Sequence, residues 1–187
     1  MTDKFTGEQI NRTFDEVFKQ TDRASAIVSS SLLEELLERL ILAFLMDNEK
    51  TKRDLFDGIA PLSTMSAKIN IAYHLGLIGK NEYEDLKFIK NIRNDFAHSF
   101  ETINFETQRI KDKCLQLKVL TSTNPPKDAM DSIKTTKTFF QINTTLLASM
   151  LYFHLSQVEH LKPYKYKTED KGKDTQQKSR RGSGLVS

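Results

Sequence analysis

The stretch of sequence that decides the fold is Leu32-Leu33-Glu34-Glu35-Leu36-Leu37-Glu38-Arg39-Leu40-Ile41-Leu42-Ala43-Phe44-Leu45. Its large apolar residues recur as adjacent pairs four positions apart, so on a helix they form one broad apolar stripe. Charged residues fill the opposite side, where Glu35 and Arg39 have the i, i+4 spacing of a favourable helical ion pair. The stretch therefore predicts a long amphipathic helix over residues 21–46 that packs against other helices.

Turn and capping residues on the C-terminal side of this helix predict where the next helices begin and end. Gly58 and Pro61 break the chain, and Ser63 or Ser66 can cap a helix that ends before Gly76. The following helix is expected to start at Asn81-Glu82-Tyr83-Glu84, with Asn81 as the cap and Glu84 at the third position. An apolar face then recurs at helical spacing through Leu86, Ile89, Ile92 and Phe96.

Two further apolar periodicities follow, over residues 106–120 and 131–161, and they are separated by the loop sequence Asn124-Pro125-Pro126. No alternation of apolar and polar residues bounded by turn signals occurs, so strands are not expected. We therefore predict an all-α fold, a helical bundle of about five helices. The stripe of the last helix is wide enough to serve both a core and a partner surface, which favours a homodimer.

Composition and charge divide the 187 residues into a helical domain, 1–161, and a basic tail, 162–187, that is predicted to be disordered. The tail holds 8 of the 28 Lys and Arg residues and 3 of the 25 Asp and Glu residues, a net charge of +5. The domain is left with 20 basic and 22 acidic residues, a net charge of −2. A DNA-binding domain usually concentrates positive charge on a folded face, and the net charge of this domain does not indicate one.

The sequence favours a cytoplasmic protein without a cofactor. Cys114 is the single cysteine, so no intrachain disulfide can form, and no signal peptide precedes the domain. Apolar runs fall far short of the roughly 20 residues that span a bilayer, so no membrane association is expected. The four histidines do not have the spacing of a metal site, and no glycine-rich phosphate loop occurs. We therefore predict no metal and no cofactor.

Arg93-Asn94-Asp95-Phe96-Ala97-His98 is the segment with the residue types for catalysis. On a regular helix Arg93 lies on the shoulder of the apolar stripe and His98 lies nearly opposite, so one unbroken helix cannot bring both to one site. They can share a site if the helix ends near Ala97, or if two copies of the helix meet across the axis of a dimer.

The same segment resembles the HEPN motif, in which an arginine and a following polar residue precede a histidine. The resemblance implies that the predicted all-α fold is an HEPN-like helical bundle, and it implies metal-independent cleavage of RNA. His98 would transfer protons, Arg93 would bind the phosphate charge, and Asn94 would position one of them. A similar motif occurs in helical HEPN relatives without nuclease activity. The alternative role is structural, with Arg93 paired to Asp22, Glu34 or Glu35 and His98 stabilising a helix C-terminus.

A longer resemblance covers roughly residues 22–120. The segments Asp22 to Val28, Ala60-Pro61-Leu62-Ser63-Thr64-Met65-Ser66-Ala67-Lys68-Ile69, Ile71 to Ile78 and Asn104 to Cys114 occur in the order typical of the mannitol operon repressor (MtlR) family. Ala60 and Met65 depart from the Gly and Phe that are frequent there. The resemblance implies a helical regulator of transcription that lacks a recognisable helix-turn-helix.

Taken together, these features favour an MtlR-like transcriptional regulator that acts mainly through protein contacts. The alternative is an HEPN-type metal-independent endoribonuclease, a toxin or defence effector, that uses Arg93, Asn94 and His98. A weaker third interpretation is an adaptor that its basic tail tethers to nucleic acid. The expected partners are a second copy of the chain and a regulator or antitoxin protein, with RNA as the substrate of the alternative function.

Overall fold

The computed structural model describes residues 7–45 and 50–162 of the chain. The described ranges form nine helices and no strand, which confirms the predicted all-α class. The helices are α1 (Gly7–Phe18), α2 (Asp22–Phe44), α3 (Thr51–Phe56), α4 (Met65–His74), α5 (Lys80–His98), α6 (Gln108–Cys114), α7 (Val119–Ser122), α8 (Lys127–Asp131) and α9 (Thr136–Gln157). Most of the predicted tail, from residue 163 onward, lies outside the described residues.

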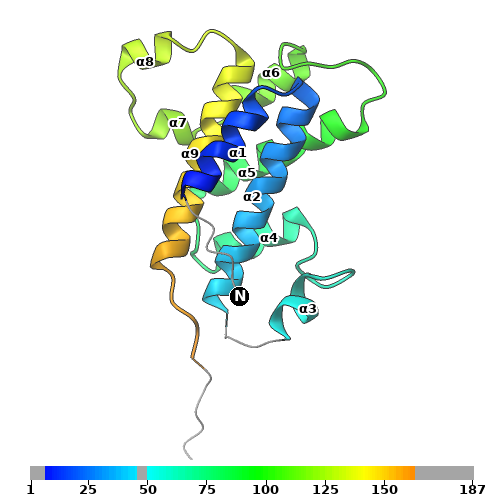
Figure 1. Cartoon of the computed structure of the whole chain (residues 1–187), viewed down its shortest axis with the longest axis vertical. Coiled ribbons are helices and arrows are strands. Elements are labelled where there is room, and N and C mark those ends of the chain that lie inside the picture. The colour runs from blue at the N-terminus through cyan, green and yellow to red at the C-terminus, as the bar shows by residue number, and fades with distance from the viewer. Residues whose placement is uncertain (1–6, 46–49, 163–187) are drawn as a thin grey trace, which may run out of the picture.

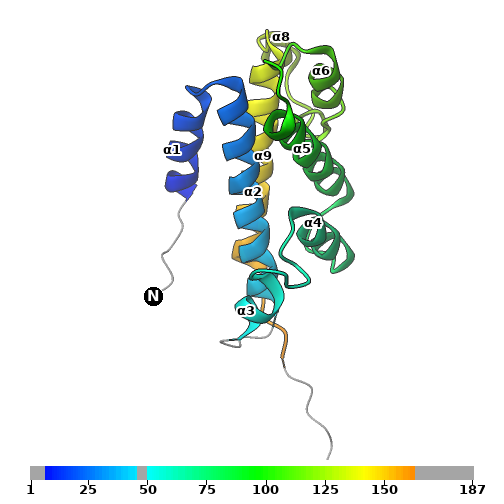
Figure 2. The ribbon, with the colours of Figure 1, turned by 90° about the vertical axis from the view of Figure 1, so that its right-hand side faces the viewer.

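Helix α2 is the axis of the bundle, and its bounds agree with the long helix that the sequence predicts. The Thr21 side chain caps it by accepting a hydrogen bond from the Ala24 N–H. It packs against α9 along its length, with α1 on one side of this pair and α4 and α5 on the other (Figures 1 and 2). Its paired leucines are buried, so the apolar stripe faces neighbouring helices in more than one direction.

Aromatic rings join α5 to α9 through the intervening loop. The Phe105 ring lies 5.1 Å from the Phe96 ring of α5 and 4.9 Å from the Phe140 ring of α9, measured between centroids. All three side chains are at most 1% exposed. Tilted aromatic pairs at this distance are favourable beyond the apolar area that they bury, so this cluster fixes the position of α5 against the bundle.

A buried lysine ties α4 to α2. The Lys68 ammonium lies 3.1 Å from a Glu34 carboxylate oxygen and 2.9 Å from a Glu38 oxygen. Burial opposes the charged form, but the two carboxylates outweigh it and raise the pKa of Lys68. The charge is therefore retained and doubly paired, which offsets much of the cost of taking it out of water.

Several predicted helix boundaries are wrong, and each has a local cause. Helix α4 is capped by Thr64, not by Ser63 or Ser66. Helix α5 starts two residues earlier than predicted, because Gly79 is its cap and the Glu82 carboxylate accepts the Gly79 N–H.

The predicted helix over 106–120 is two helices, because Asp85 of α5 accepts the backbone N–H groups of Lys118 and Val119. The predicted helix over 131–161 is shorter at both ends, since Thr135 caps α9 and α9 ends at Gln157. The number of helices is therefore higher than about five, with α1, α3 and α8 not anticipated. No described helix is long and apolar enough to cross a membrane.

Candidate functional site at the end of helix α5

The last turns of α5 hold the candidate residues Arg93, Asn94 and His98. Ile92 and Phe96 are fully buried and anchor this part of the helix to the core. Helix α5 continues through His98, and the Ser99 N–H closes it by donating to the Asp95 carbonyl. The helix thus ends one residue beyond Ala97, which leaves His98 in its last turn and on another side of α5 than Arg93.

Arg93 and His98 line two different pockets. The first, which we call the Arg93 pocket, has a volume of about 300 Å³ between α2, α4 and α5. It is lined by Glu34, Ser63, Thr64, Met65, Ser66, Lys90, Arg93 and Asn94. The second, the His98 pocket, has a volume of about 500 Å³ and is lined by Asn94, Asp95, His98, Ser99, Phe100, Glu101 and Arg109. Only Asn94 lines both pockets.

Arg93 is half-buried and lacks the carboxylate partner that a purely structural role would require. Its guanidinium donates to the Asn94 side-chain oxygen at 3.0 Å. The three carboxylates that the sequence suggested have other partners: Asp22 pairs with Lys137, Glu34 with Lys68, and Glu35 with Arg39. Within the described residues, no carboxylate oxygen lies within ion-pair distance of Arg93. Its charge is thus available to a ligand.

His98 is exposed and, in the described part of the chain, its ring has no hydrogen-bond partner. A catalytic histidine is usually oriented by a second group that bonds its other ring nitrogen. The neighbouring carboxylate, Asp95, instead pairs with Lys113 of α6. Next to His98, the Phe100 side chain is fully exposed on a turn that Arg23 holds by donating to the Ser99 carbonyl at 2.9 Å.

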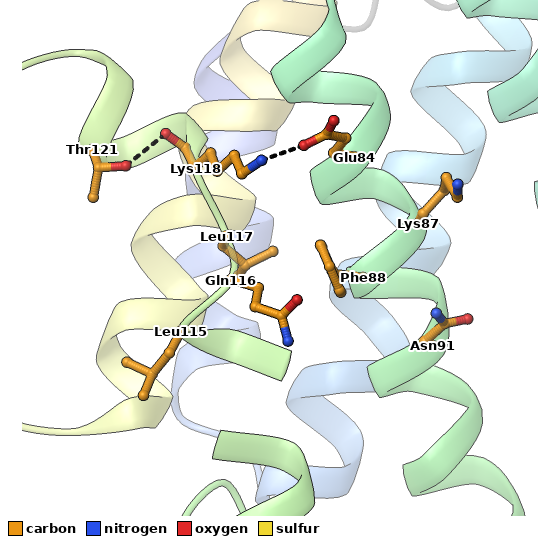
Figure 3. Close-up of a pocket in the computed structure, with 9 residues that line it drawn as sticks. All are labelled: Glu84, Lys87, Phe88, Asn91, Leu115, Gln116, Leu117, Lys118 and Thr121. Carbon is orange, nitrogen blue, oxygen red and sulfur yellow. Dashed lines mark hydrogen bonds and ion pairs between the residues drawn. The ribbon is translucent and has the colours of Figure 1, made fainter. Parts of the chain in front are cut away.

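A third cavity lies between α5 and residues 115–121 (Figure 3). The sequence gives no indication of it. It has a volume of about 600 Å³, and Phe88, Leu115 and Leu117 supply its apolar lining. The Lys118 ammonium pairs with the Glu84 carboxylate at its rim. This cavity exists because the chain leaves the helix between α6 and α7, a break that the apolar periodicity does not reveal.

The remaining candidates for chemistry have structural roles. The Cys114 thiol is buried and its pKa is raised to about 12 by burial, so a reactive thiolate does not form near neutral pH. The His154 ring lies 2.8 Å from the Glu82 carboxylate and links α9 to the start of α5. Among the described residues, no group of three or more His, Cys, Asp or Glu side chains could hold a metal ion.

Two solved structures of other proteins have a similar all-helical fold. The first is MtlR in the MtlR–HPr complex from Escherichia coli, with 23% identity, a TM-score of 0.61, and coverage of 76% of this chain and 97% of that one. The second is YggD from Shigella flexneri 2a, described as a possible transcriptional regulator, with 17% identity, a TM-score of 0.65, and coverage of 81% and 99%. These similarities establish the fold.

The family follows from the sequence of the whole helical body. The MtlR family model, described as mannitol repressor, matches residues 8–159, and the chain belongs to this family. It is also 29% identical over 111 residues to the mannitol operon repressors of Escherichia coli K12 and of Escherichia coli O6:H1. That alignment spans 57% of this chain and 57% of the length of these relatives.

Proposed function

We propose that this chain is a cytoplasmic transcriptional regulator of the mannitol-repressor type that acts mainly through protein contacts. The observation that carries the proposal is the extent of the family match. Residues 8–159 take in all of the described helices except the first residue of α1. The likeness therefore belongs to the packed helical body and not to one short motif.

The distribution of charge supports action through proteins. Residues 1–161 carry more acidic than basic residues, 22 against 20, whereas DNA binding draws most of its affinity from the neutralisation of phosphates by basic side chains. The relative from Escherichia coli was solved in complex with HPr. An HPr-like protein is accordingly the first partner to test for this chain.

A homodimer is part of the proposal, because α9 leaves apolar surface uncovered. Most of its stripe packs on the core, but the Phe153 side chain is 61% exposed. Sedimentation at micromolar concentration is expected to report a dimer. If the protein sediments as a monomer, the stripe of α9 serves only the core of one chain.

The ribonuclease alternative, with Arg93, Asn94 and His98 as catalytic residues, stays a prediction. Because Arg93 and His98 line different pockets of one chain, this function would require a second copy to supply the missing group. Incubation of the purified dimer with single-stranded RNA tests it. We expect no cleavage, and cleavage that His98→Ala abolishes would favour the alternative.

The regulator proposal is tested by transcript measurement in the source organism. Deletion of the gene is expected to raise transcription of the operon that the chain represses, and expression of the chain from a plasmid should restore repression. An empty plasmid is the matched control. If no transcript changes upon deletion under conditions in which the chain is expressed, the proposed function is wrong.

A further inference from the structure

Two segments that the sequence analysis singled out separately meet in the Arg93 pocket. The segment Ala60 to Ile69 supplies Ser63, Thr64, Met65 and Ser66, and the end of α5 supplies Lys90, Arg93 and Asn94. In Figure 2, α4 and α5 lie on the same side of α2, which brings these two segments together. The proposed contacts with proteins do not account for this pocket.

The pocket carries two positive charges that the protein does not neutralise. Glu34 is the only acidic residue in its lining, and its carboxylate pairs with Lys68. Glu38 also pairs with Lys68, and it pairs with Lys52 at a distance of 3.6 Å. The two glutamates and the two lysines of this group cancel. Lys90 has no carboxylate partner in the described ranges, as is also true of Arg93. The Lys90 ammonium donates instead to the Ser66 hydroxyl at 3.1 Å.

Among the described residues, hydrogen-bond donors without an acceptor line the same pocket. The backbone N–H groups of Met65 and Ser66 are in the first turn of α4, and within the described chain they donate to no acceptor. The positive end of the α4 dipole favours an anion at the same place. The Ser63 hydroxyl is likewise without a partner among the described residues, and it adds a neutral donor to the wall.

We propose that the Arg93 pocket binds the phosphate group of a small phosphorylated metabolite. An arginine fork and a lysine together match the two negative charges and the several acceptor oxygens of a phosphate monoester. The hydroxyls of Ser63 and Ser66 match hydroxyl groups on the rest of the ligand, as does the side-chain NH₂ of Asn94, which donates to no acceptor in the described part of the chain. The volume of about 300 Å³ suits a small molecule and not a folded partner or a nucleic-acid strand.

Isothermal titration calorimetry of the full chain tests the site with inorganic phosphate, glycerol 3-phosphate, glucose 6-phosphate and unphosphorylated glycerol. We expect glycerol 3-phosphate and glucose 6-phosphate to bind, and we expect unphosphorylated glycerol to give no heat of binding. Lys90→Gln and Arg93→Gln should each weaken binding about tenfold or more, since each removes one charge-assisted contact. Lys87→Gln is the matched control: it removes a cation of the same helix that contacts the Tyr83 ring, and it should change affinity less than about twofold.

Amide chemical shifts provide an independent readout of position, and circular dichroism shows that each variant is folded. On addition of glycerol 3-phosphate, the backbone amides of Met65 and Ser66 should shift in the wild type and not in Arg93→Gln. The proposal is overturned if no phosphate ester gives a saturable heat up to about 10 mM. It is equally overturned if only inorganic phosphate binds, or if Lys87→Gln weakens binding as much as the two pocket variants.

Discussion

The two halves of helix α5 use their polar side chains in different ways. In the N-terminal half, Glu82 binds His154 of α9 and caps its own helix, Glu84 pairs with Lys118, and Asp85 holds the backbone before α7. In the C-terminal half, Arg93 and His98 face pockets and have no partner on another described element. Asp95 and Lys90 are exceptions there, because Asp95 pairs with Lys113 of α6 and Lys90 donates to the Ser66 hydroxyl of α4.

The comparison indicates which half stabilises the fold and which half is free to bind. A buried polar group that satisfies backbone donors is costly to remove, whereas a side chain that faces solvent or an open pocket is not. We therefore expect substitutions in the first half to lower stability, and substitutions of Arg93 and His98 to change binding at little cost in stability.

Asp85→Ala is expected to have the largest effect on stability. The Asp85 side chain is fully buried and accepts the N–H groups of Lys118 at 2.9 Å and Val119 at 2.8 Å. Its loss leaves the buried Val119 donor and the half-buried Lys118 donor without an acceptor, at a cost of about 3 kcal/mol. Urea denaturation followed by circular dichroism measures this. Asn91→Ala, at an exposed position of the same helix, is the control, and equal losses for the two variants would contradict the division of α5.

The pH dependence of stability sharpens the same contrast. Burial raises the pKa of Asp85, and the hydrogen bonds from Val119 and Lys118 oppose it only in part. A carboxyl group whose pKa is raised by folding stabilises the folded state fully at pH values below its pKa in the unfolded chain, about 4. This contribution is lost as the pH rises through the pKa in the folded state. The free energy of unfolding of the wild type minus that of Asp85→Asn, measured by urea denaturation, should therefore become smaller from pH 4 toward pH 7. If this difference grows with pH, the hydrogen bonds outweigh burial in their effect on the pKa of Asp85.

Arg93→Ala and His98→Ala are expected to have much smaller effects on stability. Arg93 loses a single neutral hydrogen bond to Asn94, and His98 loses no hydrogen bond that the described residues make. We expect losses below about 1 kcal/mol for Arg93→Ala and below about 0.5 kcal/mol for His98→Ala. Thermal unfolding of the two variants beside the wild type measures this. A loss of several kcal/mol for Arg93→Ala would mean that its charge neutralises a buried group.

Removal of residues 163–187 is expected to have the smallest effect. The tail has no helical periodicity, so its deletion should leave helicity and the unfolding temperature nearly unchanged. Its positive charge should matter only for weak, salt-sensitive binding to nucleic acid, which the deletion should reduce. A fluorescence titration with nonspecific DNA at two salt concentrations tests this. A clear drop in the unfolding temperature would show that the tail packs on the bundle.

The sequence reveals those parts of the fold that depend on residues near one another along the chain. The paired leucines of α2 predict its length and its broad apolar stripe, and Ile89, Ile92 and Phe96 predict the buried face of α5. The break between α6 and α7 could not be predicted, because the carboxylate that causes it belongs to Asp85, 33 positions before Lys118.

The candidate site was predictable only in part for the same reason. The helical angle between Arg93 and His98 correctly places them on different sides of α5. That Ser63 and Ser66 line the pocket of Arg93 depends on how α4 packs on α5, which local periodicity does not encode. That Arg93 has no carboxylate partner among the described residues likewise depends on Lys68, Lys137 and Arg39, each of which pairs with a carboxylate that Arg93 could have used.

The helical body of this MtlR-family chain is proposed to act through protein contacts and not to recognise DNA itself. The most direct test is an equilibrium titration of the full chain against the promoter whose transcript rises upon deletion, at about 0.15 M salt, and in parallel against the HPr-like protein of the same organism. We predict saturable binding to the protein, and promoter binding no tighter than to DNA of scrambled sequence. If the chain alone binds the promoter specifically and does not bind the HPr-like protein, the proposed function through protein contacts is wrong.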